Sequence, residues 1–355
     1  MISDILGHYG IHEFTAEVLA SGLINSTWKI KSGSRHYILQ RVNQNVFKKP
    51  IDLAENIRRL NDHLKKHSPA YLFVAPLTND LQEDLFQVQG DGYYRLFDFI
   101  EGSHTINVVS SPEQAYEASR QFGKFTRILS DFDASSLHIT IPDFHNLTLR
   151  YQQFEDSIAF GNRVRIVDAA DAIGEIKKYK SILEAFEKIK KNRNVKQRVT
   201  HHDTKISNVL FDDEGKGLCV IDLDTVMPGF FISDVGDMMR TYLSPANEEE
   251  NDLSKIEIRD EFFRAIVHGY LSNMRDELTG EEKDLIYYAG AFLVYMQAIR
   301  FLADHFNNDS YYGASYEGHN FSRAKNQLKL LQKLEEKKAL LEEIISKELR
   351  VKKSY

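Results

Sequence analysis

The sequence predicts an α+β fold of two lobes: a small N-terminal lobe with an antiparallel sheet and one helix, and a larger, mainly helical C-terminal lobe. Residues 15–98 contain short runs in which apolar and polar residues alternate, as strands require. Beyond residue 101 the apolar residues recur at helical spacing. A chain of 355 residues is long enough for two lobes, and we place them at 1–98 and 99–355.

The small lobe is expected to hold five strands and one helix. Three strands lie before residue 43, and two flank Gly90-Asp91-Gly92, which is a strong hairpin signal. Between the two groups, residues 52–67 are expected to form a helix, because their leucine and isoleucine residues fall on one face. The five strands are expected at 16–20, 26–30, 36–42, 85–89 and 93–97.

The large lobe is expected to begin with a helix that runs to about residue 129. Ser111-Pro-Glu-Gln114 offers this helix a cap, a proline at its first position and a capping-box partner. The last helix is expected over 321–353, either packed on the lobe or forming a coiled-coil partner site. Further helices are expected at 151–160, at 173–190 and from about residue 233.

Composition excludes several classes of function. The net charge of −7 and the dispersed basic residues leave no electrostatic footprint for nucleic acid. The most apolar window, 287–296, is too short to span a bilayer and is expected to be a buried helix. Residues 1–8 do not resemble a signal peptide, and Cys219 is expected to be a buried thiol in a reducing compartment. We therefore expect a cytoplasmic monomer or homodimer that binds neither nucleic acid nor membranes.

Two polar motifs carry most of the functional information. His201, Asp203 and Asn208 form the pattern H-x-D-x-x-x-x-N, and Asp222 and Asp224 follow shortly afterwards. Phosphoryl transfer needs one carboxylate that aligns an acceptor hydroxyl, and an amide and a second carboxylate that hold magnesium beside the ATP phosphates. The two motifs supply these groups.

Apolar runs place the two motifs side by side. Residues 208–211 and 218–221 are typical of paired antiparallel strands, with 212–215 as the turn. Asn208 then begins one strand and Asp222 follows its partner, so the predicted hairpin brings these two side chains together.

The motifs resemble the catalytic and metal-binding loops of the aminoglycoside phosphotransferase and choline kinase family, which has a protein-kinase-like fold. The resemblance is carried by Asp203-Thr-Lys205, Asn208 and Ile221-Asp222. The wording His201-His-Asp-Thr-Lys-Ile-Ser-Asn208, Val220-Ile-Asp-Leu-Asp-Thr-Val-Met-Pro-Gly229 and Asp234-Val-Gly-Asp237 is more narrowly similar to N-acetylhexosamine 1-kinases. The resemblance implies an ATP- and Mg²⁺-dependent kinase that acts on a small molecule.

The resemblance also implies roles for the motif residues. Asp203 is expected to accept the proton of the acceptor hydroxyl, and His201 to orient the backbone of its loop. Lys205 is expected to reach the γ-phosphate or to be a solvated lysine. Asn208 and Asp222 are expected to bind magnesium.

Two further groups of acidic residues are expected to support the site. Asp224 is expected to hold a second ion or a bound water, or else to make a structural hydrogen bond. Asp234 and Asp237 begin a helix and are expected to cap it and to brace the catalytic loop.

The nucleotide is expected to contact the small lobe and the junction between the lobes. By resemblance, Arg41 takes the place of the phosphate-binding lysine of kinases, and Glu55 is its expected ion-pair partner. The phosphate-covering loop is expected at Ser21–Thr27, and the adenine-binding hinge at Phe97–Ile100. The expected contributors are Asn25, Ser26 and Thr27 in the loop and Phe97, Phe99 and Ile100 in the hinge.

The acceptor is the least determined part of the prediction. Residues placed similarly to Arg300 and Tyr311 contact the sugar in N-acetylhexosamine 1-kinases, although an arginine that closes a core ion pair is the alternative. A buried arginine suits a neutral or anionic acceptor better than a cationic one, which favours the anomeric hydroxyl of an N-acetylhexosamine over choline, homoserine or an aminoglycoside. Two other classes stay open: a metal phosphohydrolase that uses His202-Asp203, and a catalytically inactive nucleotide-binding protein.

Overall fold

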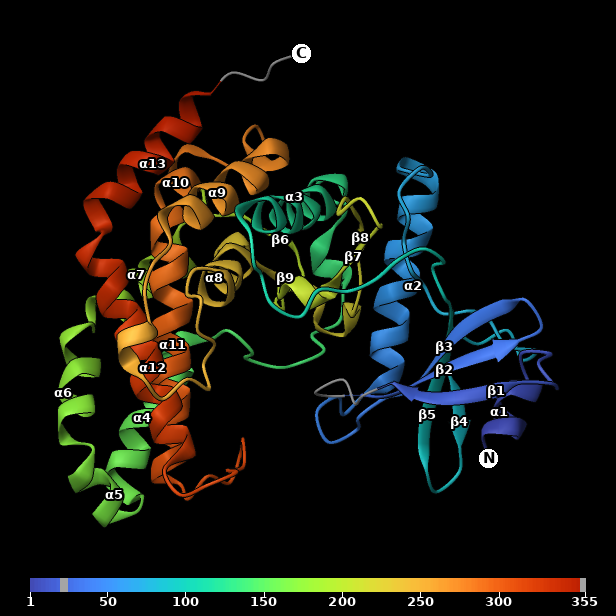
Figure 1. Ribbon diagram of the computed structural model, residues 1–355, viewed down its shortest axis with the longest axis horizontal. Coiled ribbons are helices and arrows are strands. Elements are labelled where there is room, and N and C mark those ends of the chain that lie inside the picture. The colour runs from blue at the N-terminus through green and yellow to red at the C-terminus, as the bar shows by residue number, and fades with distance from the viewer. Residues whose placement is uncertain (20–24, 352–355) are drawn as a thin grey trace.

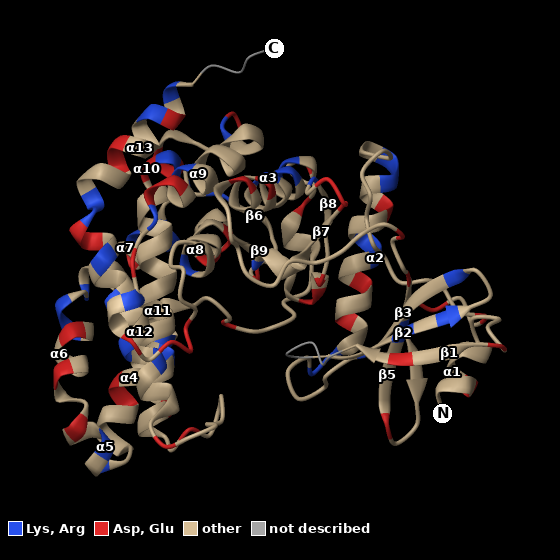
Figure 2. Ribbon diagram, in the orientation of Figure 1, with Lys and Arg blue, Asp and Glu red and all other residues tan. Residues whose placement is uncertain are grey.

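The computed structural model describes residues 1–19 and 25–351. It contains two lobes, with a five-stranded antiparallel sheet in the N-terminal part and a large helical C-terminal part (Figure 1). The predicted α+β architecture is confirmed. Lys and Arg alternate with Asp and Glu along the outer helices, so neither sign dominates them (Figure 2).

The sheet of the small lobe has the strand order β1-β2-β3-β5-β4, and every neighbouring pair is antiparallel. The face of the sheet that points away from the large lobe packs on helix α1 (Ile2–Gly7), where Leu6, Ile30, Leu39 and Leu96 belong to a separate small core. The strands are β1 (Thr15–Leu19), β2 (Ser26–Ser32), β3 (Arg35–Arg41), β4 (Phe86–Val88) and β5 (Gly92–Asp98).

Helix α2 (Pro50–His67) stands between the sheet and the large lobe (Figure 1). Its buried residues Ile57, Leu60 and Leu64 belong to the core of the large lobe, not to that of the sheet. The side chain of Asn56 donates to the backbone oxygens of His138, at 2.9 Å, and Val226, at 3.3 Å. Helix α2 is therefore attached to the large lobe by both apolar and polar contacts.

The large lobe is built around helix α11, whose most apolar window of 18 residues is 83% buried. The predicted cap of the first long helix is confirmed, because Ser111 Oγ accepts from Gln114 N. The helices are α3 (Pro112–Ile128), α4 (Leu147–Phe160), α5 (Arg163–Asp168), α6 (Ala170–Lys178), α7 (Ser181–Lys191), α8 (Phe231–Tyr242), α9 (Asp260–Met274), α10 (Gly280–Asp284), α11 (Ile286–Phe306), α12 (His319–Glu336) and α13 (Lys338–Arg350).

Two helix predictions were wrong in length. The segment 173–190 is divided between α6 and α7, and the tail is divided into α12 and α13 at Lys337. The ammonium group of Lys337 lies 2.7 Å from the Ile258 carbonyl and 2.7 Å from Asp260 Oδ1. The chain turns at this point, and α13 then packs against α9.

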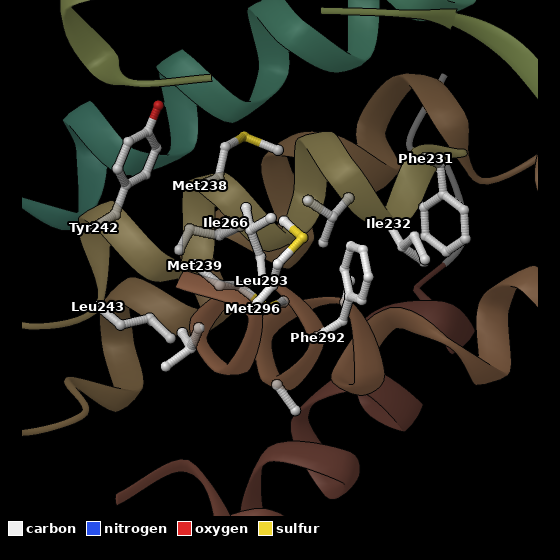
Figure 3. Packing of buried hydrophobic residues seen from close by; sticks show 14 of the residues in the cluster. Phe231, Ile232, Met238, Met239, Tyr242, Leu243, Ile266, Phe292, Leu293 and Met296 are labelled. Carbon is white, nitrogen blue, oxygen red and sulfur yellow. The ribbon is translucent and has the colours of Figure 1, made fainter. Parts of the chain in front are cut away.

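Helices α8 and α11 approach each other closely at glycine. A methyl group at Gly236 of α8 would lie 2.3 Å from the Ala289 carbonyl of α11. Around this point Met239 and Phe292 lie in a tightly packed apolar cluster (Figure 3). This close approach fixes the position of the middle of α8 against α11.

Two short two-stranded sheets flank the polar motifs. Strands β7 (Val209–Phe211) and β8 (Gly217–Val220) pair antiparallel, as predicted. A second pair, β6 (Gln197–Thr200) with β9 (Met227–Phe230), was not predicted. Strand β6 leads directly into the first motif, and β9 follows the second. The pairing of β6 with β9 therefore holds together the two ends of the segment that contains both motifs.

Candidate active site

A cavity of about 520 Å³ lies between the lobes. Strands β2, β3 and β5 of the small lobe contribute Thr27, Gln40 and Arg95 to its lining. The large lobe contributes Asn208 and Asp222. The two motifs of the sequence therefore face one cavity together.

The catalytic loop holds Asp203 in a fixed position. The Asn208 side-chain amide donates to the backbone oxygen of Asp203, at 2.9 Å, and to its carboxylate, at 3.2 Å. Lys205 Nζ lies 3.1 Å from the same carboxylate. Burial opposes the charge of Lys205, but the carboxylates of Asp203 and Asp237 outweigh this effect and raise the pKa of its ammonium group.

The β7–β8 hairpin sets Asn208 beside the second motif. Ile221 N donates to Asn208 O at 2.9 Å, and Asp222 follows in a left-handed conformation, with φ 59° and ψ 61°. The Asp222 side chain is exposed to the cavity but is surrounded by protein atoms. This desolvation, together with the nearby carboxylates of Asp224 and Asp203, raises its pKa to about 7.

The two aspartates of helix α8 hold the loop of the first motif, as predicted, but they do not cap the helix, which begins at Phe231 without a side-chain cap. Asp234 accepts hydrogen bonds from the backbone N–H groups of His201, at 3.1 Å, and His202, at 2.7 Å. Asp237 accepts from Thr204 N at 2.8 Å. Desolvation raises the pKa of Asp234 to about 7, against these two hydrogen bonds.

The ring of His201 is fully buried, and its Nε2 lies 3.0 Å from the Ile221 carbonyl. The rings of Phe122 and Phe125 meet it edge to face. His201 thus joins the two motifs without facing the cavity, and it is a positioning residue for Asp203.

The structure gives Asp224 a structural part in the site. Arg95 donates to both of its carboxylate oxygens, at 2.6 and 2.9 Å, and Asn25 donates to one of them at 2.8 Å. Asp224 is 1% exposed. The expected alternative of a structural hydrogen bond is therefore present, and the expectation that Asp224 binds a metal ion stays a prediction.

The prediction that Arg41 pairs with Glu55 was also wrong. Arg41 binds Asp91, with its guanidinium 2.6 Å from the Asp91 carbonyl and 3.1 Å from its carboxylate. Glu55 pairs with Arg59 and His138. Consecutive side chains of a strand point to opposite faces, so the polar residue of β3 that lines the cavity is not Arg41 but its neighbour.

That neighbour is Gln40, which works together with a cation from β5. Gln40 Oε1 accepts from the guanidinium of Arg95 at 2.9 and 3.2 Å, and both residues line the cavity. The positive charge of the small lobe at the site therefore comes from Arg95, which the sequence analysis did not identify.

The expected hinge lines the cavity with Phe97, Asp98, Phe99 and Ile100. Of the expected phosphate-covering loop, residues 21–24 lie outside the described residues. The remaining residues have distinct positions: Thr27 lines the cavity, Ser26 is exposed at the start of β2, and Asn25 is buried against Asp224.

Arg300 and Tyr311 lie together at a second cavity, of about 400 Å³, in the large lobe. The guanidinium of Arg300 is 5.9 Å from the ring centres of both Phe144 and Tyr311. The Phe144 ring also lies 6.3 Å from the ring of His202. One aromatic side chain thus separates Arg300 from the residue that precedes Asp203.

Arg300 has no carboxylate within ion-pair distance among the described residues, and its guanidinium donates to Gln297 Oε1 at 3.2 Å. The alternative of an arginine that closes a core ion pair is therefore wrong. Arg150 lines the same cavity, and its Nε is buried with no hydrogen-bond partner.

Comparison with known proteins agrees with this geometry. Residues 15–282 match the model of a phosphotransferase enzyme family. Among solved structures, a microcompartment-associated aminopropanol kinase superposes with a TM-score of 0.65 at 14% identity, covering 96% of this chain and 97% of that one.

Two further structures show the same fold. A spectinomycin phosphotransferase in complex with ADP and spectinomycin has a TM-score of 0.57 at 16% identity, over 94% of this chain and 97% of that chain. A choline kinase from Cryptosporidium parvum Iowa II has a TM-score of 0.54 at 13% identity, over 94% and 91%. At these identities the structures establish the fold alone, whereas the family model covers most of the chain. The chain therefore belongs to the phosphotransferase enzyme family and is an enzyme that transfers a phosphoryl group to a hydroxyl acceptor.

Proposed function

We propose that this protein is an ATP- and Mg²⁺-dependent kinase that phosphorylates the anomeric hydroxyl of an N-acetylhexosamine, such as N-acetylglucosamine or N-acetylgalactosamine. The observation that carries the kinase part is that Asn208 and Asp222 line one cavity between the lobes, while the side-chain amide of Asn208 donates to the carboxylate of Asp203. ADP in the spectinomycin phosphotransferase supports an adenine nucleotide as donor.

The residues of the cavity fit a magnesium ion. The amide nitrogen of Asn208 is used by Asp203, which leaves its oxygen for a cation. The carboxylate of Asp222 is exposed to the cavity, and the clustering of carboxylates that raises its pKa is relieved by a positive ion. Asn208 and Asp222 would hold the ion, and hard oxygen ligands suit it. Bound magnesium neutralises charge on the transferring phosphates.

The role of Asp203 follows from its surroundings. Asn208 and Lys205 fix its carboxylate, so it is oriented before any substrate binds. It accepts the hydrogen bond of the acceptor hydroxyl and takes the proton as the oxygen bonds to phosphorus. Lys205 lies beside the same carboxylate, where its positive charge stabilises the negative charge of the transferring phosphoryl group.

The acceptor side of the proposal rests on Arg300 and its aromatic neighbours. A guanidinium without a carboxylate partner repels a cationic acceptor and donates hydrogen bonds to sugar hydroxyls. The rings of Phe144, Tyr311 and Tyr312 lie around it, and sugars favour an aromatic face with a few fixed polar groups. These features support a sugar over choline, ethanolamine or an aminoglycoside.

The test is an acceptor panel read by ADP release. It contains N-acetylglucosamine, N-acetylgalactosamine, choline, homoserine, aminopropanol and spectinomycin, each with MgATP. The proposal expects the highest kcat/KM with an N-acetylhexosamine, and a phosphorus NMR spectrum of the product that shows coupling to the anomeric proton. Preferred turnover of an amino alcohol or an aminoglycoside would refute the sugar assignment and leave the kinase intact.

Two variants separate the acceptor contact from nucleotide binding. Arg300→Met keeps the apolar stem of the side chain and removes the donors, and it is expected to raise the KM for the sugar while the KM for ATP stays unchanged. Arg127→Met is a matched control on α3, where the arginine pairs with Glu277 at the surface. Equal effects of both variants would contradict the acceptor role of Arg300.

A further inference from the structure

Three potential metal ligands meet near the C-terminal end of α2, and none of them lines the cavity between the lobes. His63 and His67 lie one helical turn apart on α2, and Asp131 lies in the segment after α3. Their ligand atoms all fall within 4.8 Å of one another. Histidines at positions i and i+4 of a helix project from one face and form a known chelating pair.

The distances suit a tetrahedral ion. His63 Nε2 lies 3.1 Å from Asp131 Oδ1, and His67 Nδ1 lies 3.6 Å from Asp131 Oδ2. Bonds of about 2.0–2.1 Å around tetrahedral zinc place neighbouring ligand atoms roughly 3.3–3.4 Å apart. Both separations are within a few tenths of an ångström of that value, although they end on different oxygens of Asp131. The three ligand atoms lie within 4.8 Å of one another, so side-chain rotations would bring them onto one ion.

The two imidazole rings lie against each other on one face of α2, and His67, the more exposed of the two, would rotate out of this stack to direct its nitrogen at the same ion as His63. The rings stack with 4.3 Å between centroids and 13° between planes, and Phe132 meets the His63 ring edge to face at 5.2 Å. Phe132 and the helix therefore fix His63, which is only 14% exposed in its side chain. His67 and Asp131 are 42% and 60% exposed, which leaves room for a water ligand.

We propose that His63, His67 and Asp131 form a binding site for a divalent transition-metal ion, of which Zn²⁺ is the expected occupant. Two imidazoles and one carboxylate, with water in the fourth position, are a common donor set for zinc. Magnesium does not suit this site, because it prefers oxygen ligands in an octahedral arrangement.

The ion would join two parts of the chain that are distant in sequence. Helix α2 already contacts the large lobe through Asn56, near its first half. Metal binding at His63 and His67 would add a further polar link, from the C-terminal end of α2 to the segment that follows α3. The site therefore stabilises the docked position of α2 and takes no part in the transfer of the phosphoryl group.

The experiment measures zinc binding by the full-length enzyme in excess magnesium and ADP, which occupy the active site. Titration calorimetry on the wild type is expected to show one equivalent of zinc that His67→Ala lacks. Asp131→Asn keeps both imidazoles and is expected to weaken that equivalent by roughly 10-fold or more, since even a residue outside the metal's direct ligands contributes 10- to 100-fold. Zinc is also expected to raise the midpoint of thermal unfolding in the wild type and not in His67→Ala.

His8→Ala is the matched control, because His8 is similarly exposed and pairs with a single carboxylate, Asp80, at 2.9 Å. It is expected to bind zinc as the wild type does, and all variants are expected to keep kinase turnover, which shows that they fold. Equal zinc binding by the wild type and His67→Ala would overturn the site. Unweakened binding by Asp131→Asn would overturn the three-ligand assignment.

Discussion

Arg95 and Asp224 form a doubly hydrogen-bonded ion pair at the junction of the two lobes, with N···O distances of 2.6 and 2.9 Å. Arg95 belongs to β5 of the small lobe, and Asp224 lies two residues after Asp222 in the second motif of the large lobe. Both side chains are almost completely buried. The pair therefore connects the small-lobe wall of the cavity between the lobes to the loop that carries Asp222.

Arg95→Met is expected to destabilise the protein and to weaken nucleotide binding. Removing one partner leaves the Asp224 carboxylate buried without its main counter-ion, which costs about 3–5 kcal/mol. The free energy of unfolding in denaturant and the KM for ATP measure the two effects. Arg41→Met is the matched control, since Arg41 pairs with Asp91 outside the cavity. A larger rise in the KM for ATP from Arg41→Met would contradict the assignment of the site cation to Arg95.

The comparison of Arg41 with Arg95 shows what the sequence could and could not predict. Asn208 and Asp222 flank a single hairpin, β7–β8, so their proximity follows from local patterning alone. The contact between Arg95 and Asp224 joins residues 129 positions apart and depends on how the lobes dock. No local signal marks such a contact. Within β3, a one-residue error in assigning the strand position was enough to select the wrong face.

The remaining differences have similar causes. The paired strands β6 and β9 have weak patterns of their own, and they are fixed by the polar loops that they enclose. The division of the tail at Lys337 results from contacts of that lysine with Ile258 and Asp260, which belong to another part of the lobe. The apolar repeat continues through the break and gives no sign of it.

Stability is expected to depend on pH through His202. Burial lowers the pKa of its imidazole from 6.5 to about 3, and its ring faces the half-buried ring of His145, with 3.4 Å between their Nδ1 atoms. Between pH 6.5 and 3 the unfolded chain binds a proton that the folded protein excludes. The stability contributed by the neutral ring is therefore complete above pH 6.5 and is lost as the pH falls, by about 2 kcal/mol at pH 5.

The measurement is the free energy of unfolding of the wild type and of His202→Asn at pH 7.5 and pH 5. Asparagine tolerates the positive φ of 66° at this position. The loss of stability at pH 5 is expected to be smaller in the variant by about the amount that His202 contributes. The same loss in both proteins would show that His202 is protonated in the folded state.

Gly236→Ala is expected to destabilise the protein by about 1–3 kcal/mol and to lower turnover, because it overpacks a helix contact. The added methyl group would meet the Ala289 carbonyl of α11 and displace α8, which carries Asp234 and Asp237. Gly174→Ala is the control, since a methyl group there meets nothing within 4 Å on helix α6. Denaturant unfolding is expected to show a neutral or slightly stabilising effect for the control. Comparable losses in both variants would argue against the close approach of α8 and α11.

Asp203→Asn tests the central claim, that the two motifs form one phosphoryl-transfer site with Asp203 as its base. The variant keeps the shape of the side chain and is expected to bind MgATP within a few-fold of the wild type, while kcat falls by roughly 10²–10⁴-fold. Asp213→Asn is the control, because Asp213 lies in the exposed turn of the β7–β8 hairpin. This variant is expected to turn over normally. The measurement is the rate of phosphoryl transfer in a single turnover by the wild type and both variants, with the affinity of each protein for MgATP measured in parallel. Near-normal transfer by Asp203→Asn would contradict the account.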